Sequence, residues 1–104
     1  MFIDPAREML EDLMDDAQVE LALHGEEIRD KAWDWAKALC EKQESITVTE
    51  AMYCPQTLVE AGKAPGGVFA GFAFRLAVGE AVALSRGEDT TEIVQQRLAL
   101  RKKY

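Results

Sequence analysis

A long, almost uncharged run in the C-terminal half constrains the fold of this chain more than any other feature. Between Gly66 and Leu84 the only charged residues are Arg75 and Glu80, and apolar side chains occupy every face of a helical wheel. A helix that is apolar all round has to be buried all round. We therefore predict a mainly α fold, a compact bundle of about four helices around an apolar central helix at about 66–86.

The material available to cover that helix is limited. The chain has 104 residues, enough for one hydrophobic core, and we expect a single helical domain over 1–104. Each of the other predicted helices offers only one modest apolar stripe. A second copy of the chain would supply the missing cover, so we expect a homodimer. In the alternative, residues 45–64 fold over the open side.

Local signals place the other helices. The dipeptide Asp4-Pro5 is a capping acid before a first-turn proline, and it predicts a helix start. Further helices are expected at about 26–42 and 90–102. Gly25 is typical of a helix stop and favours a hairpin. The apolar stripe nevertheless keeps its helical phase through Gly25, so a single long helix across Gly25 is the alternative to a hairpin.

The segment 45–64 is predicted to be a long irregular or short-strand connection. Residues 45–49 alternate polar and β-branched side chains, as a short strand pairing across a dimer would. Alternatively, the threonines cap a short helix that begins near Glu50. Pro55 suits the first turn of another short helix that closes at Gly62.

Charge is distributed unevenly along the chain. The formal net charge is -7, and residues 1–44 hold thirteen acidic against five basic side chains, whereas residues 45–104 hold six against seven. Direct nucleic-acid binding is not expected, because it needs clustered Lys and Arg and only the tail at 100–104 has them. A partner protein with a basic surface suits the acidic half better.

Catalytic, metal and cofactor motifs are missing from the sequence. His24, Cys40 and Cys54 are isolated, whereas a zinc site needs ligands at close, recognisable spacings. We therefore expect no metal, no cofactor and no enzymatic activity. Two cysteines are too few for a disulfide scaffold, which favours a cytoplasmic protein. Membrane insertion is not expected, because Arg75 and Glu80 interrupt the apolar run.

Two surfaces are candidates for binding a partner. The first is the wide acidic face predicted for the first helix. The second is Trp33, which lies about 200° around a helix from Trp35 and cannot face the same core. Trp33 either packs against a neighbouring element or anchors a partner interface. The predicted partner-binding residues are Glu8, Glu11, Asp12, Asp15, Asp16 and Trp33.

Arg75 and Glu80 are predicted to be buried charges or interface residues. A buried charge is costly unless it is paired, and five positions is a poor spacing for a pair within one helix. We expect partners on other helices, such as an acid of the first helix for Arg75, or Glu80 of a second subunit.

These observations support two functional hypotheses. The first is a small acidic, non-catalytic interaction protein: a regulator, an adaptor or an inhibitor that occupies a basic nucleic-acid-binding surface of its target. Small acidic inhibitors from phages and mobile elements, anti-CRISPR proteins among them, act in this way, and the similarity is one of size and charge alone. The alternative is a small-molecule-binding or enzymatic homodimer, whose interface pocket is lined by Tyr53, Cys54, Arg75 and Glu80.

Overall fold

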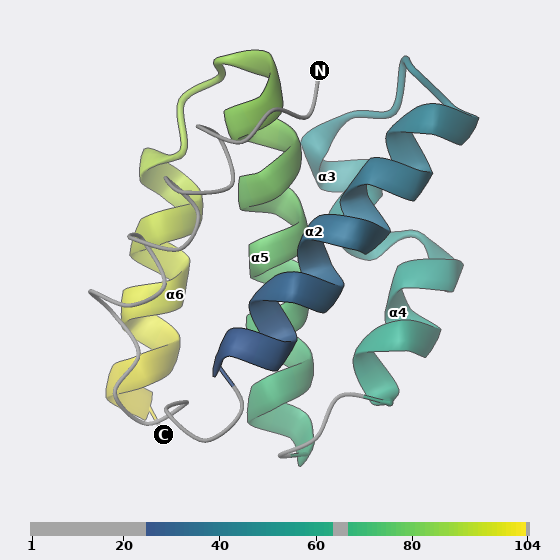
Figure 1. The fold of residues 1–104 in the computed structure, drawn as a ribbon. Coiled ribbons are helices and arrows are strands. Elements are labelled where there is room, and N and C mark those ends of the chain that lie inside the picture. Colours follow the sequence, from purple (N-terminus) through teal and green to yellow (C-terminus); the bar gives the residue numbers. More distant parts are fainter. Residues whose placement is uncertain (1–24, 64–66, 104) are drawn as a thin grey trace.

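The computed structural model describes residues 25–63 and 67–103, which form five helices (Figure 1). The helices are α2 (Gly25–Lys42), α3 (Val48–Tyr53), α4 (Pro55–Gly62), α5 (Gly67–Arg86) and α6 (Thr91–Lys103). No strand forms within these residues. The prediction of a mainly α fold is confirmed. The helix predicted at 4–24, and with it the question of a hairpin before Gly25, lies outside the described residues.

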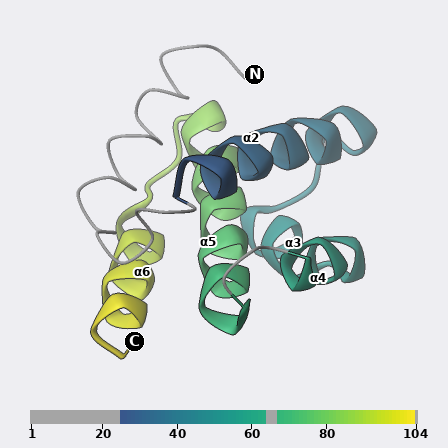
Figure 2. The ribbon, with the colours of Figure 1, turned by 60° about the horizontal axis from the view of Figure 1, so that its bottom comes forward.

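Helix α5 is the central element, as predicted. Helices α2, α3, α4 and α6 each pack against it. Figures 1 and 2 show α6 on one side of α5 and the α3–α4 pair on the other, with α2 lying across α5. The observed bounds of α5 agree closely with the predicted 66–86.

The connection at 45–64 is helical rather than extended. Thr47 caps α3: its hydroxyl accepts a hydrogen bond from the backbone N–H of Glu50 at 3.0 Å, and the Glu50 carboxylate accepts one from the N–H of Thr47 at 3.1 Å. This reciprocal capping box stabilises a helix start and removes the strand alternative. Pro55 opens α4, which ends at Gly62 as the sequence indicates.

The C-terminal end of α5 is stabilised by a backbone hydrogen bond and by the side chain of Arg86. Gly87 adopts a φ of 70°, and the N–H of Glu88 bonds the carbonyl of Ala83 at 2.9 Å, the arrangement that glycine favours after a helix. The Arg86 guanidinium donates to the carbonyls of Glu44 and Ile46. The α2–α3 loop is thereby tied to the end of α5.

Burial along α5 corrects one prediction. Every residue from 76 to 83 is buried, as expected for a helix that is apolar all round. In the N-terminal half, however, Val68 is 68% and Phe72 40% exposed. Helix α4 covers one side of this half and leaves the other open. The composition of α5 predicted burial, but it could not predict how far the neighbouring helices reach.

Candidate protein-binding groove

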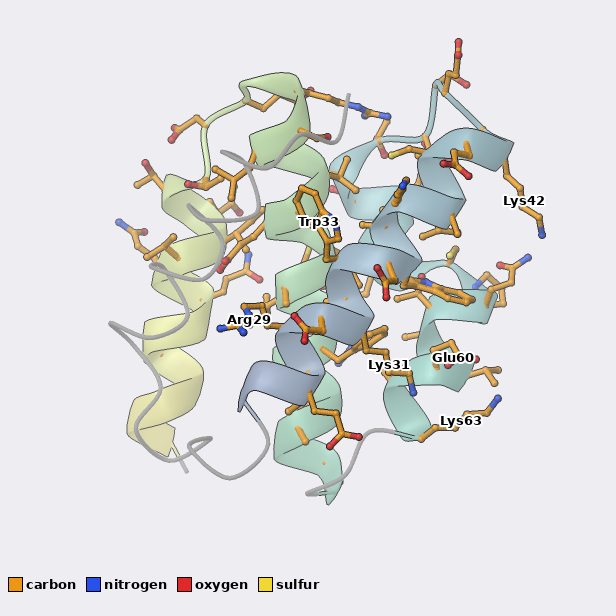
Figure 3. The ribbon with its side chains drawn as sticks, viewed as in Figure 1. Arg29, Lys31, Trp33, Lys42, Glu60 and Lys63 are labelled. Carbon is orange, nitrogen blue, oxygen red and sulfur yellow. The ribbon has the colours of Figure 1, made fainter. Side chains whose placement is uncertain are left out.

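The predicted acidic site and Trp33 have different outcomes. Glu8, Glu11, Asp12, Asp15 and Asp16 lie outside the described residues. Trp33 is 6% exposed and belongs to the core cluster around α5. Figure 3 shows its ring on the side of α2 that faces α5. Trp33 therefore packs against neighbouring helices, the first of its two interpretations, and presents no exposed anchor.

Glu80 and Arg75 also differ from each other. Glu80 is fully buried within α5, as predicted. Arg75 is only half-buried, and its guanidinium lies over the rings of Phe72 at 4.4 Å and Tyr53 at 5.4 Å. Among residues 25–63 and 67–103, no carboxylate forms an ion pair with Arg75. Two aromatic faces contact the cation, which they attract. The two expected partners, an acid of the first helix and Glu80 of a second subunit, lie outside the described residues.

The open side of α5 forms a groove with α4. It has a volume of about 470 Å³, and Arg75 is the only charged residue among the described residues that line it. Leu58 of α4 and the pair Val68 and Phe72 of α5 line it together with small residues, which we call its floor. We call this site the α4–α5 groove; it is lined by Leu58, Ala61, Gly62, Gly67, Val68, Gly71, Phe72 and Arg75.

The helical register of α4 determines which side chains line the groove. Thr57 and Ala61 are spaced one turn apart and are buried against the core. Leu58 and Val59 consequently point outward, 45% and 59% exposed. Of these two residues, Leu58 lines the groove and Val59 does not. Val59 is therefore a matched apolar control on the same helix but outside the site.

Thr57 fixes α4 to α2 and α3. Its hydroxyl donates to the carbonyl of Ala51 at 2.7 Å and accepts from Trp35 Nε1 at 2.8 Å. The Cys54 sulfur lies 3.0 Å from the same hydroxyl. Because Thr57 is fully buried, these bonds are protected from competition with water. One wall of the groove is thus held by the core.

A second contact holds α4 against α2 at the surface. Glu60 lies 3.2 Å from Lys63 and 3.4 Å from Lys31, and Figure 3 shows the three side chains converging. The hydrogen bond from Lys63, with a smaller contribution from Lys31, lowers the pKa of Glu60 below its ordinary value. Both cations favour the ionised carboxylate.

Glycines set the depth of the groove. A Cβ at Gly71 would lie 3.0 Å from the carbonyl oxygen of Ala61, so glycine permits the close approach of α4 and α5. At Gly62 an added Cβ would meet nothing within 4 Å. The floor therefore has open space above it where a partner backbone could approach.

Arg75 and Phe72 also line a smaller hollow next to the groove. This hollow encloses about 150 Å³ and reaches Tyr53 on α3 and Gln96 on α6. The groove and the smaller hollow therefore share Arg75 and Phe72. Of the four residues in the hypothetical interface pocket, Tyr53 and Arg75 lie together in the smaller hollow.

The other two residues of that hypothetical pocket lie elsewhere. Cys54 lines a separate hollow of about 470 Å³ beneath the C-terminal part of α2, with Trp35 and Ile46. Glu80 lines neither hollow that contains Arg75. Within the part of the chain that the structure describes, no cluster of His, Cys, Asp or Glu could hold a metal ion. None of its helices is long and apolar enough to cross a membrane.

Sequence reasoning missed the residues that form the groove. The sequence places Leu58 in the segment that could cover the central helix, and Val68 and Phe72 in the buried helix itself. Their apolar character does not indicate which side of each helix faces solvent. One signal does point to the groove: the other helices have too few apolar residues to cover the central helix completely. The groove lies along the part of that helix that they leave exposed.

Comparisons with protein families, with curated proteins and with solved structures found no match for this chain.

Proposed function

We propose that this protein is a non-catalytic protein-binding module whose binding site is the α4–α5 groove. The observation that carries the proposal is a hollow of about 470 Å³ lined by Leu58, Val68 and Phe72, three large apolar side chains that are 40–68% exposed. Exposed apolar side chains that gather in one hollow, rather than being scattered singly, are typical of interaction sites.

The rigidity of the groove supports the same proposal. Its α4 wall is held by the buried Thr57 hydroxyl and its α5 wall by the core. A preformed site loses little conformational entropy when a partner binds. A catalytic role is less well supported, because Arg75 is the one titratable side chain among the lining residues that the structure describes.

A matched pair of substitutions tests the proposal. Short helical peptides displayed as a library are selected on the protein, and the affinity of the selected peptides is measured by fluorescence anisotropy. Leu58→Asp should weaken binding about 10- to 100-fold, because it replaces buried apolar surface with a charge. Val59→Asp, on the same helix but outside the groove, should leave binding within about twofold. Peptides that bind both variants equally would contradict a groove site.

A finer proposal concerns the class of partner, and it rests on charge. Residues 1–44 carry thirteen acidic side chains, which suits a regulator or inhibitor that occupies a basic nucleic-acid-binding surface, as phage inhibitors of the anti-CRISPR kind do. Binding to such a target in the cytoplasm should weaken steeply with salt. It should also fall when Asp12, Asp15 and Asp16 are changed to Ala, and be insensitive to Leu58→Asp if the groove takes no part.

A homodimer remains the competing proposal for the open side of α5. Light scattering during size exclusion, at low and moderate salt, measures the mass directly. A mass near twice 11.6 kDa that returns to the monomer value in Leu58→Asp would assign the groove to a second copy. A monomer leaves the groove available to another protein.

A further inference from the structure

We infer that the occupant of the α4–α5 groove is a short amphipathic helix of a partner protein, with an Asp or Glu side chain placed against Arg75. This inference rests on the proposed function, because it specifies the chemistry of the partner at the same site. Three properties of the groove carry it: its hydrogen-bonding capacity, its length and its charge.

The side chains of the lining offer almost no hydrogen-bonding group to an extended backbone. Of the eight described lining residues, seven have side chains without N–H or O–H groups, and Arg75 is the exception. An extended peptide would bury unpaired backbone N–H and C=O groups there, which is costly. A helix satisfies these groups internally and presents only side chains.

The length of the groove limits the helix that it can hold. The lining residues on α5 run from Gly67 to Arg75, about 12 Å along the helix, which corresponds to about two turns of a partner. Two turns present apolar side chains at positions i, i+3 or i+4, and i+7. Open space above Gly62 lets that helix approach the floor closely.

The positive charge of the groove favours an acidic side chain on the partner helix. Among the described lining residues only Arg75 is charged, and no described carboxylate forms an ion pair with it. Phe72 and Tyr53 support the guanidinium from their ring faces, which leaves its N–H groups for a ligand. A partner carboxylate would gain a charge-assisted hydrogen bond that strengthens as the groove loses water.

A partner is favoured over a second copy because of net charge. Each chain carries -7, so two copies repel each other at long range. Residues 8–21 nevertheless combine leucines with acids, which makes self-association the outcome that the experiment has to exclude.

The inference is tested by reversing one charge. A displayed library of short helical peptides, each with apolar residues at helical spacing and one position varied among Asp, Glu, Asn, Gln, Lys and Arg, is selected on the wild type and on Arg75→Glu. Wild type should enrich Asp and Glu, and Arg75→Glu should enrich Lys and Arg. Acidic peptides should bind Arg75→Gln about 10- to 100-fold more weakly than wild type.

Controls separate the possible outcomes. Lys37→Glu makes the same change in net charge on an exposed face of α2 outside the groove, and it should keep the acidic preference. Thermal melts check that each variant is folded. Peptides that lose affinity in Leu58→Asp but show no acidic preference would overturn the inference and leave the proposed function standing. The absence of any binder sensitive to Leu58→Asp would overturn both. A dimer that Leu58→Asp dissociates would replace the partner helix with a second copy.

Discussion

The two halves of α5 have the same apolar character but different surroundings. Residues 76–83 are buried on every side, between α2, Met52 of α3 and Ile93 of α6. Residues 67–75 share the composition, yet Val68 and Phe72 face solvent. The difference teaches that apolar surface on one continuous helix serves two purposes: the enclosed half supplies the core, and the open half forms a wall of the groove.

Two phenylalanines in this helix provide the sharpest test of the comparison. Phe74 is fully buried and Phe72 is 40% exposed. Phe74→Ala should lower the free energy of unfolding by about 3–5 kcal/mol, because it leaves a cavity in the core. Phe72→Ala should cost less than about 1 kcal/mol and weaken peptide binding instead. Urea denaturation measures both, and equal costs would mean that the two halves are not distinct environments.

The attachment of α4 is expected to give the next largest effect. Thr57→Val keeps the shape of the side chain but removes the hydroxyl that joins Ala51 and Trp35. Leaving these buried polar groups without a partner should cost about 2–3 kcal/mol. Thr57→Ser retains the hydroxyl and should recover most of the loss in the same denaturation experiment. If both variants are equally unstable, the hydrogen bonds do not hold this wall.

Two glycines contrast the enclosed and open regions on a smaller scale. A Cβ at Gly79 would lie 2.5 Å from the sulfur of Met52, whereas one at Gly62 would meet nothing within 4 Å. Gly79→Val should therefore cost about 1–2 kcal/mol through overpacking. Gly62→Ala should be neutral or slightly stabilising, because alanine favours the helix. Melting temperatures of the two variants distinguish these outcomes.

The smallest predicted effect is a dependence on acid pH. The pKa of Glu60 is lowered from 4.5 by the hydrogen bond from Lys63, then by Lys31. A carboxyl whose folded pKa is depressed contributes stability above its ordinary pKa and loses it as the pH falls through the folded pKa. The melting temperature should thus fall less between pH 6 and 3 in Glu60→Gln than in wild type, by a small amount at this exposed position. An identical fall in the two proteins would show that this contact does not stabilise α4.

The carboxyl of Asp89 gives an independent check that stability falls in acid. The hydroxyl of Thr91, and then its backbone N–H, lower the pKa of Asp89, which accepts both hydrogen bonds at the start of α6. Asp89→Asn should likewise reduce the loss of stability in acid. Because Asp89 lies outside the groove, Asp89→Asn should leave the affinity for peptides unchanged.

Signals confined to a few neighbouring residues were read correctly from the sequence. The proline at the start of α4 and the glycine after α5 predicted helix boundaries, because capping depends on adjacent backbone groups. For residues 45–49 the sequence left a strand and a threonine cap open, and the cap is the one that forms. The last helix, expected at about 90–102, begins at Thr91, whose N–H and hydroxyl donate to Asp89.

The groove could not be predicted in the same way, because it depends on contacts between distant parts of the chain. The sequence does not indicate that Tyr53, on another helix, supplies an aromatic face to Arg75. Trp33 and Trp35 cannot face the same core, and the structure shows that Trp33 is buried, at 6% exposed, while Trp35 reaches Thr57 on α4. Periodicity identifies an apolar face but not the element that will cover it.

The link between Arg86 and the α2–α3 loop has a consequence for the order of folding. It joins Glu44 to a residue 42 positions later, at the far end of α5. Closing a loop of this length costs conformational entropy before the contact can stabilise the fold. The loop should therefore acquire its native structure late, and its amides should exchange with solvent before those of α5 when the protein opens.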